Sequence, residues 1–267
     1  MTVSFDEITL TMSSTPLTGV GTSSTPQASV PGSATSGKKG LSYNSASLTS
    51  LFSGKGISWV YNWAAVADGP ILPGADYVAM LWGEKSIDTW SASAAAAISS
   101  GTTHVLSFNE PDHAEQANMD PTVAAQTHID YLNPLADQVS IGSPAITNGG
   151  SPMGIQWLEN FFSACGAQCK VDFVAFHWYD AASNFAYFEK HVEDVISLAQ
   201  RQGIEKVWLT EFGASGSEDE VAAFLRQAVD YLDGNPAVER YAYFMCSDGI
   251  LVDGNAISNP IGEEYVK

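Results

Sequence analysis

The sequence predicts an α/β protein with a single (β/α)₈ TIM barrel, and three observations lead to this prediction. Eight short runs rich in β-branched and aromatic residues alternate with segments of helical spacing. No glycine-rich phosphate loop follows the first run, which weighs against the alternative, a doubly wound open sheet. Polar and aromatic residues gather at the carboxyl ends of nearly every run, where barrel enzymes place their active sites.

The predicted strands share a composition that suits burial on both faces of a parallel sheet. They cover Lys38–Asn44, Gly56–Trp63, Asp76–Gly83, Thr103–Glu110, Gln138–Thr147, Val171–Tyr179, Lys206–Gly213 and Val238–Cys246.

The predicted helices follow most of these strands and show apolar residues at helical spacing. They cover Ser86–Ser100, Pro121–Asp137, Gly154–Cys165, Asn184–Gln202 and Ser217–Leu232. Asp120 precedes Pro121 as an N-cap, and Ser217 with Glu220 forms a capping box. The link after Trp63 is too short for a long helix and is expected to be irregular.

Residues 1–37 differ in composition from the rest of the chain. From residue 9 to residue 37 the sequence is dominated by Ser, Thr, Pro and Gly, without an aromatic or charged residue. Such a segment buries too little apolar surface to offset the entropy of ordering it. We therefore expect a flexible tail or linker over residues 1–37 and a single folded barrel domain over residues 38–267.

The charge of the chain excludes two classes of partner. With 11 basic and 30 acidic residues the formal net charge is -19, which repels nucleic acid and anionic membrane surfaces. A neutral polymer meets no such repulsion. No apolar run is long enough to cross a bilayer, and the first residues do not resemble a signal peptide. Either the protein is cytosolic or a signal has been removed, and the low charged fraction and acidic isoelectric point suit an extracellular protein.

Two glutamates stand at the ends of predicted strands. Glu110 ends the fourth strand, and Glu211 lies near the end of the seventh. In a closed barrel these ends face each other across one opening. Glycosidic cleavage requires such a pair, one carboxyl group protonated and the other ionised. A structural role, as a helix cap or an ion-pair partner, can explain either glutamate alone, but it explains both together less well.

The motifs around these glutamates resemble those of the large (β/α)₈ glycoside hydrolase clan, and residues 38–267 resemble glycoside hydrolase family 128. The resemblance rests on Asn109–Pro111, Thr210–Gly213, Tyr43–Asn44, Trp59–Trp63, Met80–Gly83 and Phe176–Tyr179. It implies hydrolysis of β-1,3-glucan with retention, Glu110 as acid/base, Glu211 as nucleophile, and neither metal nor organic cofactor. It also implies that Asn109 bonds the sugar 2-hydroxyl group.

Other residues at strand ends are expected to bind the sugar. His177 and Tyr179 fall on one face of their strand and could hold the nucleophile in position. Trp63, Trp82 and Trp178 could offer flat apolar faces to a pyranose. Asn44, at the end of the first strand, is expected to join them. Three other tryptophans are interpreted as core residues: Trp90, Trp157 and Trp208.

Cys165 and Cys169 lie close enough in sequence for a tight disulfide, whereas a metal site would need further ligands. Cys246 is expected to be a buried thiol.

Two hypotheses of different class follow. The first is a β-1,3-glucanase or a related β-glycanase of another linkage, acting as a monomer on cell-wall glucan. The second is a glucan-binding or sensing protein on an enzyme-like barrel, which would have no need of the glutamate pair.

Overall fold

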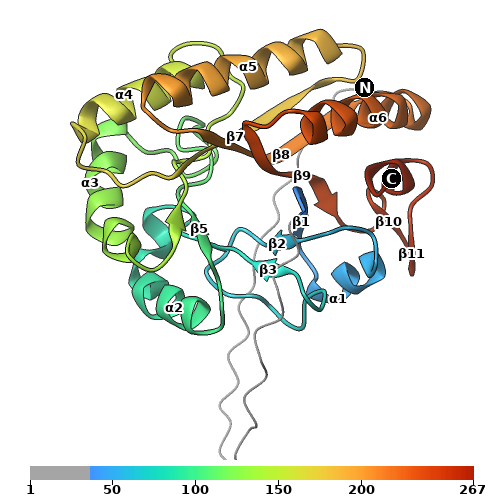
Figure 1. Ribbon diagram of the computed structural model, residues 1–267, viewed down its shortest axis with the longest axis horizontal. Coiled ribbons are helices and arrows are strands. Elements are labelled where there is room, and N and C mark those ends of the chain that lie inside the picture. The colour runs from blue at the N-terminus through green and yellow to red at the C-terminus, as the bar shows by residue number, and fades with distance from the viewer. Residues whose placement is uncertain (1–36) are drawn as a thin grey trace, which may run out of the picture. The chain divides into compact units, whose positions relative to one another are not determined.

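The computed structural model describes residues 37–267, in which parallel strands close into a barrel (Figure 1). The predicted tail, residues 1–37, therefore lies outside the described residues except for Gly37. The strands of the barrel are β1 (Lys39–Tyr43), β2 (Trp59–Tyr61), β3 (Asp76–Tyr77), β4 (Ala79–Met80), β5 (His104–Leu106), β6 (Ser140–Ile141), β7 (Phe173–Ala181), β8 (Lys206–Ser215) and β9 (Val238–Cys246).

Strand pairing runs around a full circle. One sheet has the order β3-β2-β1-β9-β8-β7, and a second has the order β4-β5-β6. The two are joined because β3 and β4 flank Val78, whose amide donates to the carbonyl of Val60. They also meet where Gly142 pairs with Phe173 beyond β6. With β3 and β4 counted as one strand, all the predicted strands are present in their predicted order, and the predicted barrel is confirmed.

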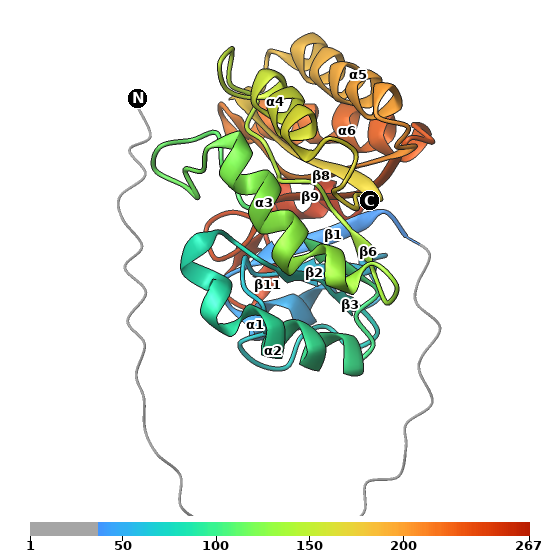
Figure 2. The ribbon, with the colours of Figure 1, turned by 90° about the vertical axis from the view of Figure 1, so that its left-hand side faces the viewer.

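Helices surround the strands (Figures 1 and 2). They are α1 (Ala46–Thr49), α2 (Ile87–Ser99), α3 (Pro121–Tyr131), α4 (Ile155–Cys165), α5 (Phe185–Arg201), α6 (Glu218–Gly234) and α7 (Ile261–Tyr265), with short 3₁₀ helices at Ser50–Phe52, Glu84–Ser86 and Asn133–Leu135. No α-helix separates β2 from β3 in the described chain, as expected for the link after Trp63. After β9 the chain adds a hairpin, β10 (Val252–Asp253) and β11 (Ala256–Ile257), which the sequence had not indicated.

Two helices begin as their sequences predict. The Asp120 side chain accepts a hydrogen bond from the amide of Thr122, with Pro121 in the first helical position of α3. At α6 the side chains of Ser217 and Glu220 form the reciprocal bonds of a capping box. These bonds satisfy backbone amides that have no partner inside the helix. The capping residues lie next to the helix start in the sequence, so both starts could be predicted from it.

Alternation along the strands divides the core into two clusters. Inside the barrel lie Trp59, Tyr61, Val78, Met80, Leu106, Phe173, Trp208 and Ala242. A larger cluster fills the space between strands and helices and includes the predicted core residues Trp90 and Trp157. Trp208 is fully buried, and it belongs to the inner cluster.

An ion pair seals the amino-terminal end of the barrel. Arg240 lies 3.0 Å from Asp76, and its guanidinium group stacks over Trp208 with 4.6 Å to the ring centroid. Large side chains and this ion pair therefore fill the lower interior. What remains for a ligand is the opposite end, where the strands terminate.

The predicted cysteine arrangement is present. Cys165, the last residue of α4, forms a disulfide with Cys169, and Cys246 is a buried free thiol.

None of the described helices is both long enough and apolar enough to cross a membrane.

Candidate active site

Glu110 follows β5 in an unusual backbone conformation. Its φ of 43° lies in the left-handed region, which a residue with a side chain enters at a cost. Its amide donates to the carbonyl of Ala145 at 2.8 Å, so the neighbouring strand end holds the turn. The side chain is 13% exposed and reaches His177. The fold thus directs this carboxyl group into the mouth of the barrel.

Glu211 lies in β8, where the strand carries one extra residue relative to its neighbour. Phe176 pairs with Leu209, but the next residue of β7, His177, pairs with Glu211. This irregularity has the form of a β-bulge, which changes the direction of the side chains that follow it. As a result both Thr210 and Glu211 contact His177, whereas Phe212 joins the outer core.

Three aromatic donors surround the Glu211 carboxylate. The indole Nε1 of Trp63 donates to Oε1 at 2.6 Å, and the Tyr179 hydroxyl donates to Oε2 at 2.6 Å. The Tyr61 hydroxyl donates to the carbonyl of Thr210 at 3.0 Å and lies 3.4 Å from Oε1. Burial and the nearby Glu211 charge raise the pKa of both tyrosines well above its ordinary value. Both phenols therefore remain protonated and act as donors.

His177 lies between the two carboxyl groups and is fully buried. Its Nδ1 is 2.8 Å from Oε1 of Glu110, and its Nε2 is 3.0 Å from the Thr210 hydroxyl and 3.5 Å from Oε1 of Glu211. Burial alone lowers the pKa of His177, but the charges of Glu211 and Glu110 outweigh it and raise the pKa. Burial alone raises the pKa of Glu110, but the hydrogen bond and charge of His177 outweigh it and lower the pKa. The proton of this pair therefore favours the imidazole.

Glu110, His177 and Glu211 also form the type of group that can hold a metal ion. Each offers one ligand atom, and these atoms lie within 4.8 Å of one another. Imidazole and carboxylate groups suit a transition metal. However, the imidazole nitrogens and carboxylate oxygens already bond one another and Thr210, so a cation would have to displace those bonds.

Asn109 has one unused polar atom at the site. The residue is 4% exposed, and its Nδ2 donates to Oε1 of Gln116 at 3.3 Å. Its Oδ1 is buried and has no partner within the described chain. A buried acceptor without a partner is costly, so a hydroxyl group from a ligand would satisfy it.

Two further predicted residues lie near the mouth without contacting the carboxyl groups. Trp82 follows the end of β4, is partly buried and packs against the inner cluster. Asn44 is exposed beyond β1 and donates to Sδ of Met245.

The expectation that Trp178 binds sugar is wrong. Its ring is 0% exposed and stacks on Phe224, with an edge contact to Phe188. Successive side chains of a strand point to opposite faces, so Trp178 points outward because His177 and Tyr179 point inward. The alternation that placed the two flanking residues already contained this correction.

Sequence reasoning missed other members of the site. Tyr61 lies two positions before Trp63, so alternation could have placed both on the inner face. Thr210 contacts His177 through the irregularity in β8, which has no sequence signal. Phe244 packs edge-on against Trp63 and Tyr179, and only the closure of the barrel brings β9 to that place.

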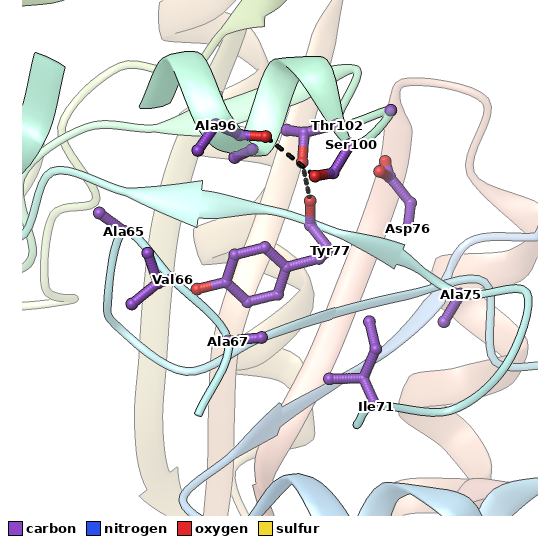
Figure 3. Close-up of a pocket in the computed structure, with 12 residues that line it drawn as sticks. Ala65, Val66, Ala67, Ile71, Ala75, Asp76, Tyr77, Ala96, Ser100 and Thr102 are labelled. Atoms are coloured by element: carbon purple, nitrogen blue, oxygen red, sulfur yellow. Dashed lines mark hydrogen bonds between the residues drawn. The ribbon is translucent and has the colours of Figure 1, made fainter. Parts of the chain in front are cut away.

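A separate hollow of about 400 Å³ lies on the outer side of the barrel (Figure 3). It is lined by the link after β2, including Val66 and Ile71, and by the end of α2. Its polar groups are already bonded within the protein, as for Thr102 with the carbonyl of Tyr77. The lining contains neither glutamate, so the site at the mouth is distinct from this hollow.

A parallel barrel with two glutamates and an imidazole between them at its carboxyl-terminal mouth defines a class, the barrel glycoside hydrolases. The family model described as "Glycosyl hydrolase catalytic core" matches residues 40–265. The chain belongs to this family and, within it, to glycoside hydrolase family 128.

Solved structures of family 128 resemble the chain over most of its length. A curdlan-specific exo-β-1,3-glucanase of subgroup III from Blastomyces gilchristii is 42% identical, with a TM-score of 0.84, covering 87% of this chain and 99% of that one. A subgroup I endo-β-1,3-glucanase from Amycolatopsis mediterranei, in complex with laminaritriose, is 31% identical, with a TM-score of 0.71, covering 86% and 98%.

A curated relative is longer than this chain. Alkali-sensitive linkage protein 1 from Schizosaccharomyces pombe is 33% identical over an alignment of 257 residues. The alignment covers 88% of this chain. The match spans 45% of that protein's length.

Proposed function

We propose that the protein hydrolyses β-1,3-glucan or its oligosaccharides with retention, using Glu211 as nucleophile and Glu110 as acid/base. The observation that carries the proposal is the pair itself: an oxygen of Glu110 and an oxygen of Glu211 lie within 4.8 Å of each other. Retaining enzymes place the two carboxyl groups roughly 5–5.5 Å apart, whereas inverting enzymes leave roughly 6.5–9.5 Å for a water molecule. The short separation therefore favours direct attack by a carboxylate.

The surroundings of Glu211 suit a nucleophile. Donors from Trp63 and Tyr179 bond its two oxygens, so the charged form is stabilised and its orientation is restricted. The side chain is 6% exposed, which keeps water from the attacking oxygen. Attack on the anomeric carbon forms a glycosyl ester with Glu211 and releases the leaving oxygen.

Glu110 donates a proton to the leaving oxygen, and it receives that proton from His177. The proton of the pair favours Nδ1 of His177, which lies 2.8 Å from Oε1 of Glu110. As a neutral sugar excludes water from the mouth, the ionised carboxylate becomes less favourable and the proton moves to Glu110. Glu110 then protonates the leaving oxygen, and as a carboxylate it later removes a proton from the water that cleaves the ester.

The comparisons and the aromatic mouth support the proposed substrate class. The solved relatives are β-1,3-glucanases, one of which holds laminaritriose. Partly buried Trp63 and Trp82 offer apolar faces to a neutral pyranose, which the acidic surface does not repel. The same proposal includes action outside the cell, on a cell-wall glucan, by a monomer. The fungal relative named as a linkage protein supports the cell-wall location.

Products from defined β-1,3- and β-1,4-linked oligosaccharides test the proposal. We expect cleavage of the β-1,3 series alone, and proton NMR should detect the β-anomer first, before mutarotation. Release of single sugars from one end would indicate exo action, and mixed internal products would indicate endo action. An initial α-anomer would exclude retention, and preferred β-1,4 cleavage would exclude the substrate class. Binding to laminarin without turnover would instead favour the glucan-binding hypothesis.

A further inference from the structure

We infer that Asp112 is a positioning residue that, through Thr147 and Asn148, fixes the acid/base Glu110 relative to the strand that supports the nucleophile. This inference rests on the proposed function. Asp112 lies two residues after Glu110. Within the described residues, its carboxylate forms no hydrogen bond with Glu110 or Glu211. What it contacts is the segment between β6 and α4.

The Asp112 carboxylate collects donors from two points of that segment. It accepts from the amide of Thr147 at 3.1 Å, from the Thr147 hydroxyl at 2.6 Å and from the amide of Gly154 at 2.8 Å. Gly154 has no room for a side chain, because an added Cβ would lie 2.3 Å from the carbonyl oxygen of Gly149. The segment therefore wraps closely around one carboxylate, and hydrogen bonds to a charged acceptor are the stronger kind.

The residue after Thr147 continues the connection to the other side of the site. The Asn148 side chain accepts from the amide of Tyr179 at 3.1 Å and donates to its carbonyl at 3.1 Å. Tyr179 in turn donates its hydroxyl to Glu211 at 2.6 Å. Hydrogen bonds, joined by the backbone link between Thr147 and Asn148, thus connect the Glu110 turn to the nucleophile without passing through His177.

Such a connection matters because the Glu110 turn is strained. The φ of 43° at Glu110 costs free energy and persists only where surrounding bonds hold it. Pro111 fixes the backbone between Glu110 and Asp112, so an anchored Asp112 limits the direction of the acid/base side chain. A displacement of about 1 Å at a reacting group can lower a rate by about 100-fold.

The test compares two substrates that differ in their need for an acid. Cleavage of laminaritetraose needs protonation of a sugar leaving group, whereas 2,4-dinitrophenyl β-laminaribioside carries a leaving group that departs unprotonated. For Asp112→Asn, we expect kcat/KM to fall about 10–100-fold on the tetrasaccharide and less than about threefold on the aryl glycoside. A general loss of folded structure would lower both values equally.

Two more variants complete the experiment. Thr147→Val keeps the shape but removes the 2.6 Å hydroxyl bond to Asp112 and the 3.0 Å bond that the same hydroxyl accepts from the amide of Gly149. Both bonds hold the segment that Asp112 contacts, so the effect should have the same substrate dependence. It should add little to Asp112→Asn, because both remove one connection. Asp120→Asn is the matched control, since this carboxylate accepts an amide bond at 2.8 Å at the start of α3. It should lower the melting temperature without changing the ratio of the two kcat/KM values.

The outcomes separate the two levels of the argument. Wild-type protein inactive on both substrates would overturn the proposed function and, with it, this role for Asp112. Active wild type with equal losses on both substrates, or with no loss in Asp112→Asn, would overturn the positioning role alone. If Asp112→Asn does not fold, Thr147→Val decides by the same comparison.

Discussion

At the scale of single residues, the site depends on contacts that carry charge. Glu211 receives bonds to both oxygens, and His177 is placed where it contacts both carboxyl groups. A neutral substitution can keep this geometry and still remove the chemistry, because only the carboxylate can attack carbon. Two predictions separate chemistry from position.

If Glu211 is the nucleophile, as proposed, Glu211→Gln should reduce kcat on β-1,3-glucan by about four orders of magnitude or more, since no other group can replace it. The fold and the binding of laminari-oligosaccharides should persist, as checked by circular dichroism and calorimetry. Glu220→Gln is the control, because this exposed glutamate serves the capping box of α6. Hydrolysis by Glu211→Gln within tenfold of wild type would refute the assignment.

Trp63→Phe should keep an aromatic face and lose the 2.6 Å bond to Glu211. If the indole nitrogen mainly holds the nucleophile, kcat should fall about 10–100-fold while KM changes little. Trp90→Phe provides the comparison, since its Nε1 donates to the carbonyl of Tyr131 outside the barrel. That change should lower the melting temperature and leave kcat unaltered. A rise in KM alone for Trp63→Phe would show that Trp63 acts only as a sugar platform.

At the scale of elements, the helices bury polar side chains that tie them to the barrel. His128 of α3 is fully buried, with Nε2 2.8 Å from the carbonyl of Lys170 and Nδ1 3.4 Å from the Ser107 hydroxyl. Burial lowers the pKa of His128 to about 4, although the bond to Lys170 opposes the shift. This helix therefore packs with a neutral imidazole.

His128 should make the stability of the protein depend on acid. Between its unfolded pKa of about 6.5 and its folded pKa of about 4, the unfolded chain binds the proton and the folded chain does not. The free energy of unfolding should therefore decrease as pH falls through this window, by about 3 kcal/mol from this residue. Urea titrations at several pH values measure the slope.

The variant His128→Gln checks the source of that slope. It cannot titrate, so its stability curve should be flatter between pH 6.5 and 4 even if its absolute stability is lower. His191 of α5, whose burial also lowers its pKa to about 4, should retain the remaining slope. A slope unchanged by His128→Gln would show that other groups cause the acid sensitivity.

At the scale of the whole molecule, the first and last strands of the barrel must meet. β1 pairs with β9, and the short helix α7 covers this junction. The fully buried Tyr265 hydroxyl donates to the carbonyl of Gly40 at 2.6 Å and accepts from the amide of Tyr243 at 3.4 Å. One side chain therefore bonds both strands where the barrel closes.

Tyr265→Phe should destabilise the protein by about 1–3 kcal/mol, because it leaves buried backbone groups without a partner. Chemical denaturation measures the change. Tyr231→Phe removes an exposed hydroxyl bond to Glu193 and should cost less than about 1 kcal/mol. Equal costs for the two variants would mean that the junction is not stabilised by the Tyr265 hydroxyl.

Much of the fold could be predicted because its signals are local. Short runs rich in β-branched and aromatic residues indicated every strand of the barrel, and caps such as Asp120 and Ser217 marked helix starts. The hairpin after β9 was missed because its strands have two residues each, too few for a periodic pattern. The two glutamates were found because each lies at or near the end of a predicted strand, which is a feature of sequence alone.

The sequence by itself determined the strands, their order and the residues at their ends, because each depends on near neighbours in the chain. Tertiary structure decided which ends touch. The extra residue in β8 brings Thr210 and Glu211 together against His177, and no local pattern announces it. Trp63 bonds Glu211 across 148 positions of sequence. Trp178 is buried because helices pack over its face of β7. Long-range contacts of this kind form only when the barrel closes. The chemistry of the site depends on them, so it could not be predicted from local sequence patterns.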